Sequence, residues 1–168
     1  MITKNQLIKK LNDSRITFQL HEHEALFTVK DSEKERGSIE GIHTKNLFLK
    51  NKKKEYFLFS CEENQLVDLK KLSKSLILGN LSFAKEADLK EYLNISPGSV
   101  TPFGLLNDSK NKVNFFLDNS LTQENQINFH PLENTATITM QIKDFINFLL
   151  VNKKKVNIFD FNTYTLIK

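Results

Sequence analysis

The chain has 168 residues, 26% of them charged and 39% hydrophobic, with a formal net charge of +4 and a pI of about 9.0. This length fits one domain over residues 1–168, and 14 phenylalanines can fill its core, which excludes a disordered chain. The single cysteine, Cys61, excludes a disulfide framework, and no segment approaches the ~20 apolar residues that span a bilayer. We therefore expect a cytoplasmic protein that does not enter a membrane.

Regular elements follow one another along the chain without a linker or an internal repeat. Helices are predicted where apolar residues recur at helical spacing. Strands are predicted where apolar and polar residues alternate, or where an apolar run stands between turn signals. In chain order we expect a helix over 3–13, a strand over 16–23, an exposed helix or turn over 28–37, a hairpin of strands over 46–50 and 55–61, a helix over 67–76, a short strand or connector over 81–85, a helix over 85–94, strands over 112–118, 126–131 and 134–140, a helix over 141–151 and a last strand over 153–161.

The interspersed helices and strands predict a mixed α/β fold, in which helices flank a barrel-like mixed sheet. The strict alternation of a doubly wound parallel fold is absent. The strands over 126–131 and 134–140 are expected to pair with the strand over 112–118. The lysine triplets 52–54 and 153–155 fall where turns are expected, and runs of like charge are usually solvated.

The basic charge permits a polyanionic partner but does not establish one. Only Arg15 and Arg36 among 24 basic residues are arginines, so the rigid fork that reads phosphates bidentately is nearly absent. There is no helix-turn-helix pattern or arginine-rich stripe, which counts against a regulatory nucleic-acid-binding protein. We therefore expect no DNA partner.

The stretch SPGSVTPFG is the clearest candidate for a functional loop. Residues Pro97 to Gly104 include two prolines and two glycines, a density that helices and central strands do not tolerate. We expect a rigid loop whose backbone N–H groups can hold a carbonyl or stabilise an oxyanion. A structural connector between a helix and a strand explains the same residues. The N–H groups expected to be exposed are those of Gly98, Ser99, Val100, Thr101, Phe103 and Gly104.

The four histidines His21, His23, His43 and His130 show no metal-binding spacing. No pair lies at i, i+4, and His21 and His23 share a strand face without a third ligand nearby. Neither a metal nor another cofactor is therefore expected. His130 stands at a strand end beside Pro131, where both a structural and a catalytic role are open.

The stretch GIHTKNLFLK joins a polar start to an apolar end. Residues 47–49 indicate the buried part of a strand, and Lys45 and Asn46 stand where that strand should begin. A lysine in this place is normally solvated. Beside an asparagine and facing a rigid loop, it also supplies charge and amide donors without a nucleophile, which suits hydrolysis by water. From the residues alone, strand mouth and active site both stay open.

The segments HEALFTV, GIHTKNLFLK, LSFA, SPGSVTPFGLLND and FHPLENTATI together resemble the free-standing prolyl-tRNA editing proteins. Those proteins are similar to the editing insertion domain of bacterial prolyl-tRNA synthetase. The resemblance covers roughly residues 20 to 150, and five motifs in register are more specific than any one of them. HTKNLFL and PGSVTPFGL are most similar to the branch that hydrolyses alanine mischarged onto proline tRNA.

The resemblance implies a barrel-like mixed α/β fold and an aminoacyl-tRNA deacylase that works without a metal. Lys45 and Asn46 take the places of the family's essential lysine and its neighbour, and His130 takes the place of the motif histidine near the aminoacyl pocket. The implied substrate-binding residues are Leu26, Phe27 and Thr28, which would line a small amino-acid pocket, and Gly98, Ser99, Val100, Thr101 and Pro102 of the substrate loop.

The expected substrate and partner is tRNA(Pro) that carries a wrong amino acid, with prolyl-tRNA synthetase as a second candidate partner. A pocket that admits alanine but not the larger proline ring would act as the second sieve. A deacylase for serine or cysteine and a non-catalytic tRNA-binding accessory of the synthetase stay open as alternatives. The joint presence of Lys45, Asn46 and His130 favours catalysis over the accessory role.

Overall fold

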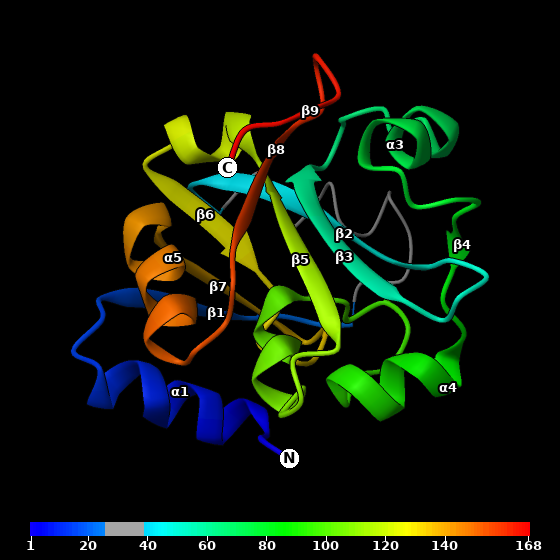
Figure 1. Cartoon of the computed structure of the whole chain (residues 1–168). Helices are drawn as coiled ribbons and strands as arrows, with labels where there is room; N and C mark the ends of the chain where they lie inside the picture. The colour runs from blue at the N-terminus through cyan, green and yellow to red at the C-terminus, as the bar shows by residue number, and fades with distance from the viewer. Residues whose placement is uncertain (26–38) are drawn as a thin grey trace.

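The computed structural model describes residues 1–25 and 39–168 (Figure 1). Its helical segments are α1 (Lys4–Asp13), α3 (Leu69–Leu76), α4 (Glu86–Asp88), the π-helical turn η1 (Leu89–Leu93), the 3-10 helices η2 (Pro102–Asn107) and η3 (Asn119–Gln123), and α5 (Ile142–Val151). Its strands are β1 (Phe18–Glu22), β2 (Ile42–Lys50), β3 (Tyr56–Glu62), β4 (Ser82–Phe83), β5 (Val113–Asp118), β6 (Gln126–Phe129), β7 (Ala136–Gln141), β8 (Asn157–Asp160) and β9 (Thr165–Leu166).

The strands form one nine-stranded sheet in the order β1-β7-β6-β2-β3-β5-β8-β9, with β4 paired to β2 off this path. Three neighbouring pairs are parallel, namely β2 with β6, β3 with β5, and β5 with β8, and the others are antiparallel. The predicted mixed α/β fold with a mixed sheet flanked by helices is therefore confirmed. None of the described helices is long and apolar enough to cross a membrane.

The expected pairing of β6 and β7 with β5 is wrong. Strand β5 pairs with β3 and β8, while β6 and β7 pair with each other and with β2 and β1. The near-continuous burial of β5 agrees with this position, because strands with parallel neighbours on both sides are typically covered on both faces. The antiparallel hairpin of β2 and β3 is confirmed.

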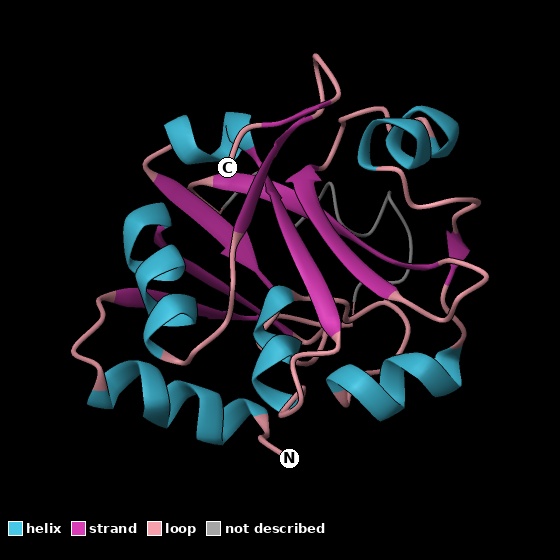
Figure 2. Cartoon of the chain, in the orientation of Figure 1, coloured by secondary structure: helices cyan, strands magenta, loops and turns pink. Residues whose placement is uncertain are grey.

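The sheet separates two hydrophobic cores. The larger core includes residues of α1 and α5, and the smaller core includes residues of α3, which lies at the upper right of Figure 2, away from α1 and α5. Strand β2 contributes to both cores because successive side chains of a strand point to opposite faces. Phe48 belongs to the larger core, and Leu47 and Leu49 pack in the smaller one.

Local signals fix the ends of the helices. The first helix begins with a capping box, in which Thr3 Oγ1 accepts from the Gln6 backbone and Gln6 Oε1 accepts from the Thr3 backbone. Its apolar stripe buries Leu7 and Leu11. Asp68 caps α3 by accepting from two backbone N–H groups of its first turn.

Some predicted boundaries differ from the structure. The helix expected over 85–94 is a short α-helical turn followed by a π-helical one, and the strand expected to end the chain is β8, which is followed by β9. Of the second lysine triplet, Lys154 is half-buried rather than solvated, because its Nζ donates to Asp108 O at 2.6 Å and to Asn111 Oδ1 at 2.8 Å. The exposed helix or turn expected over 28–37 lies outside the described residues.

Candidate active site

One edge of β2 loses its strand partner in the middle of the strand. On this edge β2 pairs with β6 through Ile42 and His43, and with β4 through Leu49 and Lys50. In the described part of the chain, no strand pairs with the edge between these positions. Residues 44–47 therefore present one edge where the parallel strands β2 and β6 separate, and such separations are where α/β sheets typically bind ligands. We call this segment the open edge of β2.

Lys45 and Asn46 lie on the open edge, inside the strand rather than at its start. Strand β2 begins at Ile42, and on its other edge Lys45 pairs with Cys61 and Asn46 with Ser60. Sequence patterning placed the start of the strand too late because the polar residues before Leu47 interrupt the apolar run. Backbone pairing does not depend on the polarity of the side chain, so the ladder continues through them.

The side chains of Lys45 and Asn46 point to opposite faces of the sheet. Alternation places Lys45 on the face of Leu47, Leu49 and the smaller core, and it places Asn46 on the face of Phe48 and the larger core. Cys61, the partner of Lys45, belongs to the smaller core as well. The two residues predicted to act as neighbours in the site therefore approach the open edge from different sides.

Asn46 holds the proline- and glycine-rich loop against β2. Its Nδ2 donates to Val100 O at 3.1 Å, and its Oδ1 accepts from Ser60 Oγ at 2.5 Å. Both ends of the amide are thus engaged within the protein. This contact brings the predicted loop and the predicted lysine–asparagine pair together at one place, with Asn46 as the link.

The loop itself is ordered by its own backbone. Gly98 has φ +86, a left-handed conformation that glycine adopts without a steric cost, and Ser99 N donates to Ser96 O at 3.1 Å. Thr101 is fully buried, and its Oγ1 accepts from Phe103 N at 3.3 Å. Pro102 opens η2, where its missing N–H is no loss.

Half of the N–H groups expected to be exposed are used within the loop. Those of Ser99, Phe103 and Gly104 donate to acceptors of the loop itself, so for them the expectation is wrong. Those of Gly98, Val100 and Thr101 donate to no acceptor among residues 1–25 and 39–168. Thr101 is fully buried, so the unbonded N–H groups that a substrate carbonyl or an oxyanion can reach are those of Gly98 and Val100.

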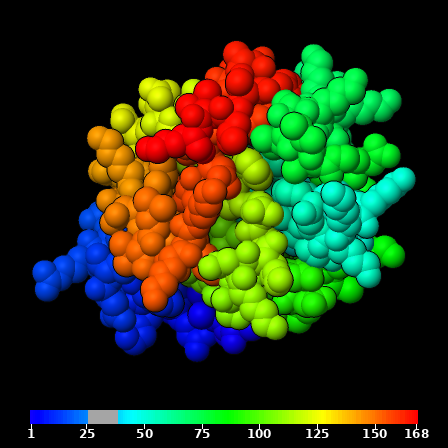
Figure 3. Space-filling view, in the orientation of Figure 1, coloured from blue at the N-terminus to red at the C-terminus, as the bar shows by residue number. Residues whose placement is uncertain are grey.

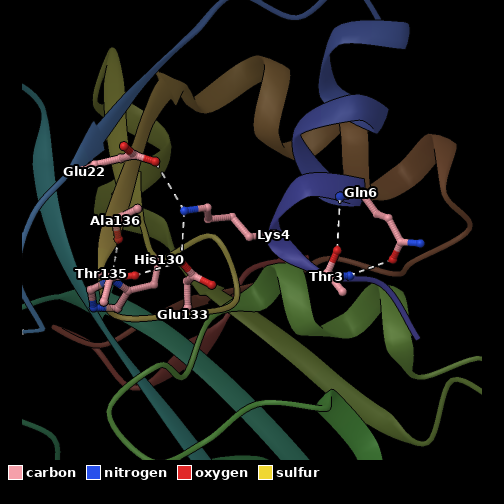
Figure 4. Close-up of polar contacts among 8 residues, drawn as sticks. All are labelled: Thr3, Lys4, Gln6, Glu22, His130, Glu133, Thr135 and Ala136. Atoms are coloured by element: carbon pink, nitrogen blue, oxygen red, sulfur yellow. Dashed lines mark hydrogen bonds and ion pairs between the residues drawn. The ribbon is translucent and has the colours of Figure 1, made fainter.

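His130 follows β6 where β6 separates from β2. Its Nδ1 lies 3.0 Å from Ala136 O, and because a carbonyl only accepts, Nδ1 carries a proton. The turn after His130 is tied to the first helix, since Lys4 Nζ lies 2.9 Å from Glu133 Oε1 and 3.4 Å from Glu22 Oε1 (Figure 4). The Lys4 ammonium, through its hydrogen bond, holds the pKa of the Glu133 carboxyl below its usual range.

A polar layer covers the face of β1, β7, β6 and β2 on which Lys45 lies. The register places Asn128 beside both Thr139 and His43, and it places His21 beside Thr137. His23 continues the layer, with Nε2 at 2.9 Å from Thr137 Oγ1, and its ring centroid lies 6.5 Å from that of His130. By alternation all four histidines of the chain share this face.

Two histidines of this layer, His21 and His43, each have a ring nitrogen without a hydrogen-bond partner in the described residues. Within the described residues, Nε2 of His21 and Nε2 of His43 are shielded from solvent and have no hydrogen-bond partner. The same described residues contain no group of three or more His, Cys, Asp or Glu that could hold a metal ion. The layer is thus a set of mostly buried polar groups beside the open edge.

Asn128 is the residue that sequence reasoning missed. Its Nδ2 donates to Glu40 O at 2.8 Å, its Oδ1 accepts from Thr139 Oγ1, and its O accepts from Thr44 Oγ1 at 2.8 Å. These bonds tie the start of β2 to β6 just before the two strands part. The signal was an asparagine between Ile127 and Phe129 in an otherwise buried strand, since buried polar groups are almost always bonded.

The proposed pocket residues Leu26, Phe27 and Thr28 lie outside the described residues. Cys61 is buried beside Lys45, and this burial raises the pKa of its thiol to about 12, which the charge of Lys45 only partly offsets. A nucleophilic thiolate is therefore not formed at neutral pH, and the described site consists of charge, amide and backbone donors.

Comparison with known proteins identifies the family of this chain. A model of the aminoacyl-tRNA editing domain matches residues 23–148, which include the open edge, the loop and His130. The chain belongs to the aminoacyl-tRNA editing domain family. It is 34% identical over 155 residues to the prolyl-tRNA editing protein ProX of Acetoanaerobium sticklandii, and the match covers 90% of this chain and 93% of that protein.

Other relatives and solved structures extend the likeness. The prolyl-tRNA synthetase associated domain-containing protein 1 of Xenopus laevis is 36% identical over 151 residues, which cover 87% of this chain and 89% of that one. A crystal structure described as a candidate trans-editing enzyme for prolyl tRNA synthetase superposes with a TM-score of 0.67 at 19% identity, over 100% of this chain and 99% of that chain. This last comparison supports the fold.

Proposed function

We propose that this protein is a trans-editing hydrolase that removes alanine from mischarged tRNA(Pro). Membership of the aminoacyl-tRNA editing family gives the enzyme class, a hydrolase of the aminoacyl ester. The observation that supports the site is the bond from Asn46 to Val100 O, which holds the loop with the unbonded N–H groups of Gly98 and Val100 against β2. The ester linkage is activated already, so positioned water and charge stabilisation suffice without a metal.

The backbone donors of the loop act on the scissile carbonyl. Water attacks the carbonyl carbon, negative charge builds on the carbonyl oxygen, and in this proposal the N–H groups of Gly98 and Val100 stabilise it. The bond from this carbon to the ribose oxygen then breaks, and the ribose oxygen takes a proton. A neighbouring ribose hydroxyl can relay that proton.

Lys45 and His130 act from the face opposite to Asn46. The Lys45 ammonium supplies positive charge at the open edge, toward the terminal phosphate, the ribose or the tetrahedral oxygen. His130, oriented by its bond to Ala136 O, contacts the aminoacyl group or positions the water. Asn46 contributes mainly as a positioning residue, because both ends of its amide are bonded within the protein.

Selection for alanine is steric in this proposal. A pocket formed with Leu26, Phe27 and Thr28 admits alanine and excludes the proline ring, which is the logic of a second sieve. Such a pocket discriminates poorly against serine, because an apolar wall rejects an added hydroxyl only weakly. The tRNA is the partner that the proposal requires, and delivery by prolyl-tRNA synthetase is compatible with it.

The deciding experiment uses tRNA(Pro) charged separately with alanine, serine, cysteine and proline. We expect the alanyl ester to be hydrolysed fastest and the prolyl ester to remain intact, with the same rates after exhaustive chelation. Faster hydrolysis of the seryl or cysteinyl ester would show that the protein removes that amino acid rather than alanine. No hydrolysis of any ester, together with binding of the tRNA, would favour the accessory role.

A further inference from the structure

Lysines gather on one face where three separate segments of the chain meet. The segments are the last turn of α1, the loop before β5 and the turn between α5 and β8, and Figure 3 shows the last two side by side on its front face, in yellow-green and orange, with the first below them in blue. We call this surface the lysine face. Its members are Lys10, Lys110, Lys112, Lys153, Lys154 and Lys155.

Side-chain hydrogen bonds fix these segments against one another. Lys154 Nζ donates to Asp108 O and to Asn111 Oδ1, which joins the turn before β8 to the loop before β5. Lys10 Nζ lies 3.4 Å from Asn152 Oδ1, which joins the first helix to the same turn. The arrangement of the lysines is therefore set by the fold rather than by chance proximity of mobile ends.

The remaining lysines of the face are free to meet a partner. Lys10, Lys110, Lys112, Lys153 and Lys155 are exposed. Few acids offset them. Asp108 is buried and its carboxylate accepts from Val113 N at 2.8 Å, while Glu91 lies in a neighbouring hollow with Lys110 and Lys112. The face is thus strongly positive, and like charge disfavours contact with a second copy of this basic chain.

The hollow at the centre of the face is too small for a free substrate. It has a volume of about 190 Å³. Its lining combines the triplet 153–155 and Asn111, Asn114 and Asn157 with Asp108 and the apolar residues Leu105, Val113 and Phe115. Sites for small molecules usually measure ~300–1,000 Å³ and are mainly apolar. A hollow of this size suits a single phosphate group of a longer polyanion, held at its mouth by the exposed Lys153 and Lys155.

The lysine face is linked to the candidate active site by η2. This helix starts at Pro102, at the end of the substrate loop, and ends at Asn107, just before the loop that carries Lys110 and Lys112. Six residues of 3-10 helix span about 12 Å at ~2.0 Å per residue. The two ends of η2 are therefore separated by a distance that a few nucleotides of one RNA strand can cover.

We propose that the lysine face binds the phosphodiester backbone of the substrate tRNA. The proposal rests on the proposed function only in assuming an RNA substrate, and it assigns a binding surface outside the reacting site. Lysines act here as point charges that release counterions, so they add affinity and salt dependence without reading sequence.

Two quadruple variants test the surface. In the first, Lys110, Lys112, Lys153 and Lys155 become glutamine. The matched control carries glutamine at four exposed lysines of the β2–β3 turn and α3, Lys52, Lys53, Lys70 and Lys74. Both variants have a formal net charge of 0, because four positive charges are removed from +4. Lys154 is left intact because it holds the loop before β5.

Binding of uncharged tRNA(Pro) is measured by filter retention over a series of salt concentrations. We expect the first variant to lose about tenfold or more in affinity at low salt, and the slope of log K against log salt to become shallower by roughly 3. The control should retain both values of the parent protein. Equal losses in the two variants, or a loss in the control alone, would overturn the proposal.

Uncharged tRNA keeps this outcome separate from catalysis. If the parent protein binds tRNA through the lysine face but hydrolyses no ester, the proposed hydrolase function is refuted and the proposed tRNA-binding role of the lysine face is supported. If the first variant deacylates full-length alanyl-tRNA with the KM of the control, the tRNA-binding role of the lysine face is refuted and the proposed hydrolase function is supported. Unfolding midpoints of both variants, measured in urea, should equal that of the parent and so exclude a folding defect.

Discussion

Asn46 donates an amide hydrogen bond to the carbonyl of Val100, a residue 54 positions later in the chain, over 3.1 Å. This bond fixes the loop that carries the free backbone donors against the open edge of β2. Replacing Asn46 with aspartate keeps the size of the side chain but puts an acceptor opposite the Val100 carbonyl. Loss of a buried bond costs about 1–3 kcal/mol, so the loop should detach and deacylation should fall about tenfold or more.

The fall in rate should appear in kcat rather than in binding of uncharged tRNA, because the affected donors act on the developing oxyanion. The same exchange at Asn5, an exposed position on α1, serves as the control. An aspartate at position 46 with unchanged kcat would remove this bond from the mechanism.

Lys45 provides a second test, since its charge approaches the open edge from the other face. Lys45→Ala should nearly abolish deacylation at unchanged stability, and Lys45→Arg should restore part of the rate because the charge returns in a different shape. Lys52→Ala, in the exposed turn, should behave like the parent. Deacylation is measured as release of labelled alanine. Full activity of Lys45→Ala would exclude Lys45 from catalysis.

The backbone at Gly98 has a φ of +86, a conformation that would strain any residue with a side chain. An added Cβ would have space, with Asn134 Nδ2 at 3.6 Å, so the effect is one of backbone conformation rather than a clash. Gly98→Ala should cost about 1 kcal/mol and lower kcat by displacing the loop. Gly98→Asn should retain more activity, because asparagine tolerates left-handed backbone better. Equal rates in both variants would contradict this ordering.

The Lys4–Glu133 ion pair predicts a dependence of stability on pH. The hydrogen bond from Lys4 lowers the pKa of Glu133 in the folded state, so the folded protein binds this proton more weakly than the unfolded chain does. The resulting stability is present above the unfolded pKa of about 4.3 and is lost as pH falls through the lower folded value.

Glu133→Gln should therefore lower the urea midpoint at pH 7 and have no effect once the pH is below the folded pKa of Glu133. The side chain of Glu133 is 45% exposed, so solvent screening limits the difference to at most about 1 kcal/mol. A difference between parent and variant that grows as the pH falls would refute this sign.

Cys61 should be unreactive in the native protein. Burial raises the pKa of its thiol to about 12, so almost no thiolate exists at pH 8, and the side chain is fully covered. Iodoacetamide should modify it slowly in buffer and quickly in denaturing urea, as followed by mass spectrometry. Rapid labelling without denaturant would show that the smaller core opens near Lys45.

Local patterns in the sequence predicted most helices and strands, but they did not predict which strands pair with one another. The capping box at Thr3 and the apolar spacing of Leu7 and Leu11 lie within one helix, so they predict it directly. The partners of β5 depend on strands far along the chain, and its apolar run is compatible with several neighbours. The prediction of those partners was therefore wrong.

The members of the candidate site stay a prediction, and the structure adds how they are arranged. Motif resemblance named Lys45, Asn46 and His130, and the structure places them around one edge of β2. The opposite faces of the two neighbours follow from simple alternation once β2 is known to begin at Ile42. The positioning role of Asn46 could not be predicted, because it depends on where a distant loop crosses the strand.

The alternation of β2 also limits how this stretch can vary in length. Inserting or deleting one residue between Ile42 and Asn46 would exchange the faces of the ammonium and the amide, because the side-chain period of a strand is two. The loop would then lose its hydrogen bond to the Asn46 amide, and the Lys45 ammonium would face the larger core. Substitutions can be accepted here one at a time, but any change in length alters both functions together.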